Sequence, residues 1–93
     1  MTRHSAPEPT PYDIIWPASF AAKLKTLDSP RLADAVTSFV WTELRFDPTE
    51  FGDYGRKLRG ELSGMYSAKQ KQFRVIYEFD EASRTITLMD VKL

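Results

Sequence analysis

The stretch from residue 73 to residue 80 places large apolar side chains at every second position. Its odd positions carry Phe73, Val75, Tyr77 and Phe79, and its even positions carry Arg74, Ile76, Glu78 and Asp80. Because successive side chains of a β-strand point to opposite faces, this period of two predicts a strand with one buried face. With the odd positions packed inward, Arg74 is expected on the opposite, open face of a sheet.

Three shorter segments show the same period and are predicted to be strands. They are residues 12–16, 65–69 and 85–91. A short turn at 80–84 joins the last two strands of the chain into a hairpin. Strict alternation in the segment 85–91 places Ile86 and Leu88 on one face of the strand and Val91 on the opposite face.

Two helices are predicted between the first and second strands. Pro17 suits the first turn of a helix over residues 17–27, because the missing N–H of proline is not needed there. Ser29 is placed to cap a second helix over residues 30–45, which has one apolar stripe. The connection between the helices is so short that they must form an antiparallel hairpin, and Pro48 ends the second one.

These elements predict an α+β fold in the order β-α-α-β-β-β. The N-terminal helix hairpin is expected to pack on one face of a small, mostly antiparallel sheet, because neither layer can otherwise bury its apolar side chains. Residues 47–56 contain proline, glycine and acidic residues and are predicted to be a loop. We predict one domain over 12–93 and a disordered, proline-rich N-terminal extension over 1–11.

Composition excludes several classes of site. The 93 residues include no cysteine, which rules out disulfides and thiolate metal sites. The single histidine, His4, lies among prolines and is interpreted as a solvated tail residue, so no metal and no cofactor is expected. No run approaches the roughly 18 apolar residues that span a bilayer, and the N-terminus lacks a signal-peptide core. We therefore expect a cytoplasmic protein with no membrane partner.

Positive charge is concentrated in one part of this neutral chain. From residue 56 to residue 74 there are six basic residues and one acid, a net charge of +5, so the remainder carries −5. Screening limits each charge to a reach of roughly 8–10 Å, so this pattern predicts a local anion site and not a generally polycationic surface. The basic residues are Arg56, Lys57, Arg59, Lys69, Lys71 and Arg74.

The chain resembles the RelE/ParE superfamily of toxins from type II toxin–antitoxin modules. The similarity covers about residues 12–92 and rests on the helix hairpin after the first strand and on several short motifs. The motifs are Asp47-Pro48, Lys57-Leu58-Arg59-Gly60, Gly64-Met65-Tyr66-Ser67-Ala68 and Phe73-Arg74-Val75-Ile76-Tyr77.

This resemblance implies a RelE-like toxin that cuts mRNA on the ribosome and is neutralised by a cognate antitoxin. The family's nuclease chemistry needs no metal: a base takes the ribose 2′-OH proton, cations stabilise the phosphate, and an acid protonates the leaving oxygen. By motif position Arg74 matches the arginine that contacts the phosphate. Lys69 matches a basic residue of the preceding strand, and Ser67 stands where that branch has another lysine.

The resemblance departs from the family pattern at the C-terminus. Family members continue past the last strand into a basic segment with an arginine or histidine and then a tyrosine, whereas this sequence ends at Leu93. Lys92 is the remaining catalytic candidate from that region. The departure implies either a shortened chain or a weak or inactive nuclease.

Each candidate residue also has a plainer interpretation. Arg74 would be structural if it paired with Glu78 or Glu61. Lys69 and Lys71 would then be solubilising charges at a hairpin tip. A solvated basic face is the alternative to RNA or antitoxin binding for Arg56, Lys57 and Arg59.

Three functions remain open at this point. The first is the ribosome-dependent mRNA endoribonuclease. The second is an inactive relative that only binds its antitoxin and regulates its operon. The third is inhibition of DNA gyrase, as in the ParE branch of the superfamily.

Overall fold

The structure, a computed structural model, describes residues 11–50 and 52–93, so the predicted extension over 1–11 lies outside the described residues except for Pro11. Five strands form one sheet in the spatial order β1-β5-β4-β3-β2. β1 is parallel to β5, and the other neighbouring pairs are antiparallel. The strands are β1 (Asp13–Ile15), β2 (Gly55–Lys57), β3 (Tyr66–Lys69), β4 (Arg74–Asp80) and β5 (Thr85–Lys92).

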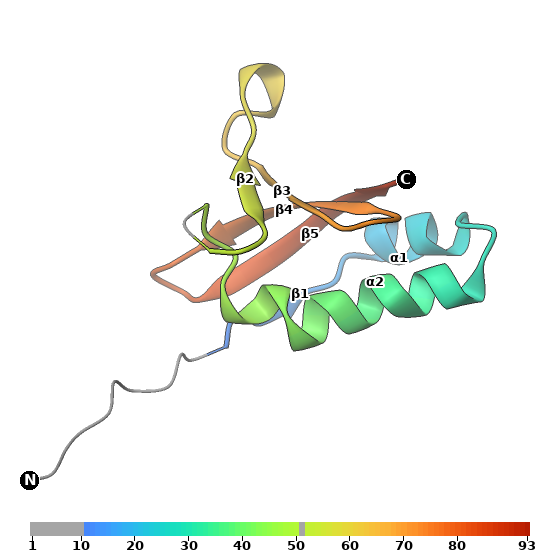
Figure 1. The fold of residues 1–93 in the computed structure, drawn as a ribbon. Helices are drawn as coiled ribbons and strands as arrows, with labels where there is room; N and C mark the ends of the chain where they lie inside the picture. Colours follow the sequence, from blue (N-terminus) through green and yellow to red (C-terminus); the bar gives the residue numbers. More distant parts are fainter. Residues whose placement is uncertain (1–10, 51) are drawn as a thin grey trace, which may run out of the picture.

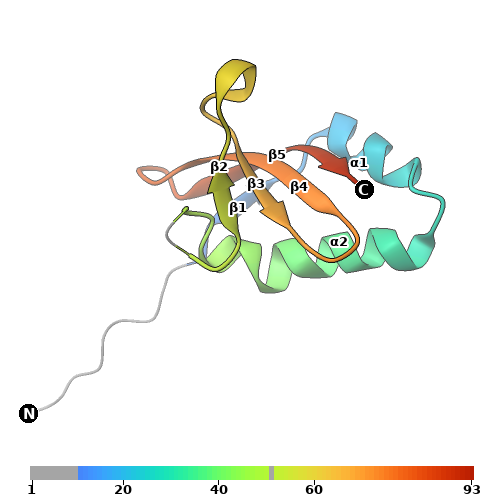
Figure 2. The same cartoon turned by 45° about the horizontal axis from the view of Figure 1, so that its top comes forward.

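Two helices lie on the same side of this sheet. α2 (Pro30–Thr42) runs beneath the sheet, and α1 (Ala18–Lys25) lies beside the C-terminal half of β5 (Figure 1, Figure 2). The predicted α+β fold, with a helix hairpin on a small and mostly antiparallel sheet, is confirmed. The predicted order lacked one strand, because β2 begins inside the predicted loop 47–56 and extends one residue beyond it. Three residues that include a glycine carry too short an alternation to indicate a strand without the partner β3.

The predicted start of α2 is confirmed. The N–H of Leu32 donates to Ser29 Oγ at 3.1 Å, which satisfies one of the free donors at the helix N-terminus. Both helices are shorter than predicted. α1 begins just after Pro17 and ends at Lys25, and α2 gives way to a 3₁₀ turn at Leu44–Phe46.

One apolar core joins the helix layer to the inner face of the sheet. Val75 and Tyr77 of β4 are fully buried there, and Phe73, which directly precedes the strand, is nearly so, as the alternation predicted. The other fully or almost fully buried apolar side chains come from both layers: Tyr12, Phe20, Val36, Phe39, Val40, Leu44, Ala68, Ile86, Leu88 and Val91.

Val91 corrects the sequence prediction. Strict alternation assigned it to the face opposite Leu88, yet both side chains are buried in the core. The reason is a register shift in the β4–β5 ladder, where Ile76 pairs with Asp90 but Tyr77 pairs with Leu88. Met89 is therefore the extra residue of a β-bulge, and the bulge shifts the phase of every later residue in β5.

Candidate functional site

Three cations lie side by side on the outer face of the sheet, away from the helices. Lys69 of β3 pairs with Arg74 of β4, and Arg74 pairs with Lys92 of β5. Residues directly opposite each other in neighbouring strands place their side chains on the same face, about 4.5–5.5 Å apart at Cβ. All three side chains are exposed. We call Lys69, Arg74 and Lys92 the cationic row.

The bulge in β5 completes the cationic row. If the strand alternated regularly through Met89 instead of bulging there, Lys92 would face the core and Val91 would face solvent. With it, Val91 is buried and Lys92 is exposed opposite Arg74. A local irregularity of the sheet therefore decides which side of the molecule the last cation occupies.

Within the described part of the chain, no side chain of the cationic row forms an ion pair or a hydrogen bond. The ion pairs found there are Lys23–Asp90 and Lys57–Glu50. Arg74 thus does not pair with Glu78 or Glu61, which removes the structural interpretation of this arginine. Three unpaired cations on rigid strands leave their charge available to a bound anion.

A shallow pocket of about 300 Å³ opens at the same end of the sheet. The cationic row lines it together with the β3–β4 turn, which contributes Lys71. Gln70, Gln72, Phe73 and Leu93 complete the lining. Two glutamines and three lysines beside an arginine provide many hydrogen-bond donors around one opening, a composition suited to phosphate oxygens.

The other predicted RNA-binding residues do not gather in one place. Arg56 of β2 pairs with Ser67, so it lies on the outer face one row away from the cationic row. Lys57 is on the helix side of the sheet, where its Nζ lies 4.0 Å from a carboxylate oxygen of Glu50. Arg59 is exposed in the segment that joins β2 to β3. The structure thus places Lys71 and Arg56 near the cationic row and Lys57 on the other face.

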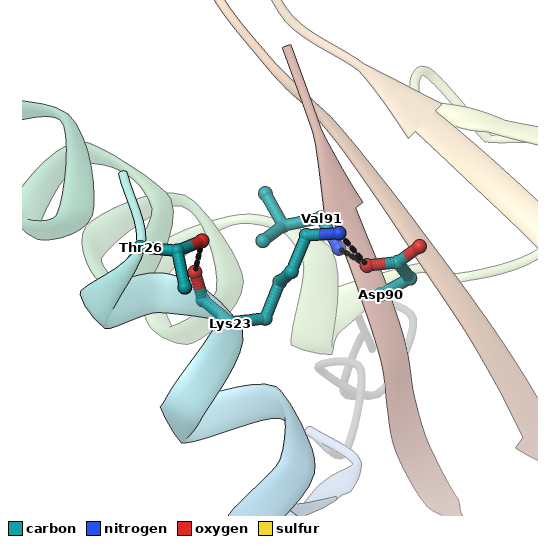
Figure 3. A network of polar contacts seen from close by, with 4 residues as sticks. All are labelled: Lys23, Thr26, Asp90 and Val91. Atoms are coloured by element: carbon teal, nitrogen blue, oxygen red, sulfur yellow. Dashed lines mark hydrogen bonds and ion pairs between the residues drawn. The ribbon is translucent and has the colours of Figure 1, made fainter. Parts of the chain in front are cut away.

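One carboxylate, Asp90, lies on the outer face next to the cationic row. Lys23 of α1 reaches it with Nζ 3.3 Å from Oδ1, and the N–H of Val91 donates to the same oxygen at 2.8 Å (Figure 3). Both partners are partly exposed, so this pair adds little to stability. Its effect at the site is that Lys23 offsets the negative charge of Asp90.

The sequence analysis missed both members of this pair. Lys23 lies on an exposed helix face and Asp90 in a segment predicted as an ordinary strand, and 67 positions separate them. No spacing rule connects such residues. Only the docking of α1 beside β5 brings them together.

The described residues include neither a cluster of metal ligands nor a helix able to cross a membrane. No group of three histidine or acidic side chains gathers among them. No helix among them has the length and apolar character needed to cross a bilayer.

Comparison with known proteins relates the chain to small toxins. No family model matches it. It is 32% identical over 62 residues to toxin RelG of Mycobacterium tuberculosis, covering 67% of this chain and 68% of the relative. It is 28% identical over 81 residues to toxin RelE of the same organism, covering 87% and 79%.

Solved structures give the same result. A chain of the RelBE2 toxin–antitoxin complex of M. tuberculosis has a TM-score of 0.81 and 29% identity, with 89% of this chain and 98% of that chain covered. A chain of the RelE–RelB complex of Pyrococcus horikoshii shares the fold, with a TM-score of 0.68 at 21% identity and coverage of 89% and 94%. The chain therefore belongs to the RelE family of toxins from type II toxin–antitoxin modules.

Proposed function

We propose that this toxin is a metal-independent endoribonuclease that cuts mRNA on the ribosome. The observation that supports it is the cationic row, in which Arg74 lies between Lys69 and Lys92 and none of the three has an intramolecular partner among the described residues. A guanidinium flanked by two ammonium groups fits the charge and geometry of a phosphodiester.

The reaction we propose is attack of a ribose 2′-OH on the neighbouring phosphate, which breaks the bond to the 5′-oxygen. Arg74 binds the scissile phosphate and stabilises the charge that grows on it in the transition state. Lys69 and Lys92 stand on either side of Arg74, so each lies beside one of the two ribose oxygens that exchange protons in this reaction. Lys71 and Arg56 extend the positive surface toward the flanking phosphates.

A cognate antitoxin is the protein partner that we propose. Structural neighbours of this chain were solved as toxin–antitoxin complexes, RelBE2 of M. tuberculosis among them. An acidic antitoxin segment laid over the cationic row would neutralise its charge and block RNA. We expect co-expression of the antitoxin to restore growth to cells that express the toxin.

The deciding experiment compares the wild type with Arg74→Ala in a translating extract that contains a reporter mRNA. We expect the wild type to cut the mRNA at ribosome-occupied positions and Arg74→Ala to cut at least about 100-fold more slowly, as when one donor to a transition-state anion is removed. Arg31→Ala is the matched control, because Arg31 is an exposed arginine on α2 outside the cationic row.

The same experiment separates the competing functions. Intact mRNA together with growth arrest would contradict the nuclease, and inhibition of supercoiling by purified gyrase would then identify the ParE-type activity. Intact mRNA with normal growth, at confirmed levels of soluble toxin, would leave antitoxin binding as the function.

A further inference from the structure

The outer face of the sheet is divided into a basic end and an acidic end. At the basic end lie the cationic row and, one row further along the strands, Arg56. At the acidic end, Glu78 pairs with Thr87 in one row, and Asp80, Thr85 and Asp13 are aligned in the next. The carboxylates of this acidic end are Glu78, Asp80 and Asp13, and all three residues are exposed.

The two ends are separate electrostatic regions. A strand rises about 3.3 Å per residue, so Arg74 and Glu78 on the same face of β4 are about 13 Å apart along the strand. This separation exceeds the screening length of about 8 Å at physiological ionic strength. Between them, the carboxylate of Asp90 is offset by Lys23, so it does not extend the acidic end into the basic one.

Only one of these three acidic side chains has an evident structural role. Asp80 accepts hydrogen bonds from the N–H of Ala82 and the hydroxyl of Ser83, so it shapes the β4–β5 turn. Glu78 and Asp13 have no side-chain hydrogen bond and no ion pair within the described residues. Their negative charge faces outward on the surface that carries the proposed RNA site.

We propose that Glu78 and Asp13 form an electrostatic stop that makes single-stranded RNA cross the sheet over the basic end, perpendicular to the strands. This inference rests on the proposed function. A strand that followed β4 would carry its phosphates from Arg74 onto Glu78 and Asp80, where like charges repel. A strand that crosses from Lys69 to Lys92 meets three cations over about 10 Å, the width of two strand spacings.

The stop also limits the kind of RNA that fits. The basic end is only a few residues long in the strand direction, so it accepts a short extended segment. A duplex presents phosphates on two strands across a much wider surface, and some of them would lie over the acidic end. The site is therefore selective for a few nucleotides of single-stranded RNA.

The test measures binding of fluorescein-labelled, 2′-O-methylated oligouridylates of about 4 and about 16 nucleotides, a range typical of single-strand sites. The methyl group removes the attacking hydroxyl, so the active toxin binds without cutting. The variant is Glu78→Gln combined with Asp13→Asn. Asp28→Asn combined with Asp34→Asn is the control, because it changes the net charge equally at two exposed positions of the helix layer, one in the α1–α2 connection and one on α2.

We expect the Glu78→Gln and Asp13→Asn variant to bind the longer oligonucleotide about fourfold more tightly, about twofold for each charge removed, because the phosphates of the longer strand reach the acidic end. Its gain for the shorter oligonucleotide should be smaller. Equal affinity to the wild type, or an equal gain in the control variant, would overturn the stop. The single variant Glu78→Gln should show about half of the effect. It keeps the proposal testable if the double variant fails to fold.

Arg74→Ala keeps the two proposals distinguishable. If Arg74→Ala abolishes binding while neutralising Glu78 and Asp13 has no effect, the RNA site stands and the stop is wrong. If Arg74→Ala leaves binding unchanged, the proposed function itself is wrong.

Discussion

At the scale of single residues, Tyr77 joins the sheet to the loop that follows α2. Its ring is fully buried, and its hydroxyl donates to the carbonyl of Pro48 at 2.5 Å. Gly55 leaves the space that this contact needs, because a Cβ there would lie 2.7 Å from the Tyr77 hydroxyl and from the carbonyl oxygen of Pro48. The hydrogen bond thus fixes the loop that leads into β2.

Tyr77→Phe should destabilise the protein by about 1–3 kcal/mol, because it leaves the buried carbonyl of Pro48 without a donor. Urea unfolding followed by tryptophan fluorescence measures the change. Tyr66→Phe is the control: Tyr66 stacks on Tyr77 but its hydroxyl has no hydrogen bond within the described residues, so we expect a change under about 0.5 kcal/mol. Equal losses in the two variants would contradict the role of the Pro48 bond.

The same tyrosine should make stability depend on pH in alkaline solution. Burial raises the pKa of Tyr77 well above its usual value of 10.0, because desolvation disfavours the phenolate. Above about pH 10 the unfolded chain loses this proton while the folded chain keeps it. The stabilising contribution is complete below that pH and is lost as the pH rises.

The expected loss is about 1.4 kcal/mol for each pH unit above about 10. Urea unfolding of the wild type and of Tyr77→Phe over this range isolates it, because the lysines titrate in both proteins. The difference in unfolding free energy between them should shrink as the pH rises. A constant difference would contradict the raised pKa.

At the scale of elements, the bulge in β5 decides which residues face the core. Because Met89 is the extra residue, its removal should restore a regular strand in which Val91 still faces the core and Lys92 still lies opposite Arg74. Deletion of Met89 should therefore change the unfolding free energy by less than about 1 kcal/mol and preserve RNA binding.

Leu88→Ala is the comparison. It removes an almost fully buried leucine side chain from the same strand, and such a loss costs about 2–5 kcal/mol. Thermal unfolding of the two variants measures the contrast. Equal destabilisation would show that the strand does not use Met89 as its bulge.

At the scale of the whole molecule, the faces of the sheet should determine which cations bind RNA. A plot of the logarithm of the affinity for single-stranded RNA against the logarithm of the salt concentration has a slope of about −0.7 per phosphate contact. Three contacts from the cationic row therefore give a slope of about −2. Lys69→Ala and Lys92→Ala should each reduce the slope by about 0.7. Lys57→Ala should leave it unchanged, because Lys57 lies on the helix side and pairs with Glu50.

Titrations of a labelled single-stranded RNA at several salt concentrations test this prediction. A weaker salt dependence for Lys57→Ala than for the wild type would show that RNA wraps around the edge of the sheet at β2. An unchanged slope for Lys69→Ala would exclude that residue from the phosphate path.

The sequence also predicted much of the fold at this scale. Long elements with a strong period, such as β4 and α2, were located to within a few residues, and Ser29 was identified as a cap. β2 was missed because three residues carry no measurable period. The phase of β5 was missed because a bulge has no signal in a strand of mixed side chains.

For the candidate site, the sequence by itself determined the residue types and the face on which Arg74 stands, because both follow from local alternation. Only the tertiary structure decided that Lys69 and Lys92 flank Arg74, that Lys57 lies on the other side, and that Lys23 offsets Asp90. The physical reason is that these relations depend on register between strands and on the docking of α1, which are set by packing across the core and not by neighbours along the chain.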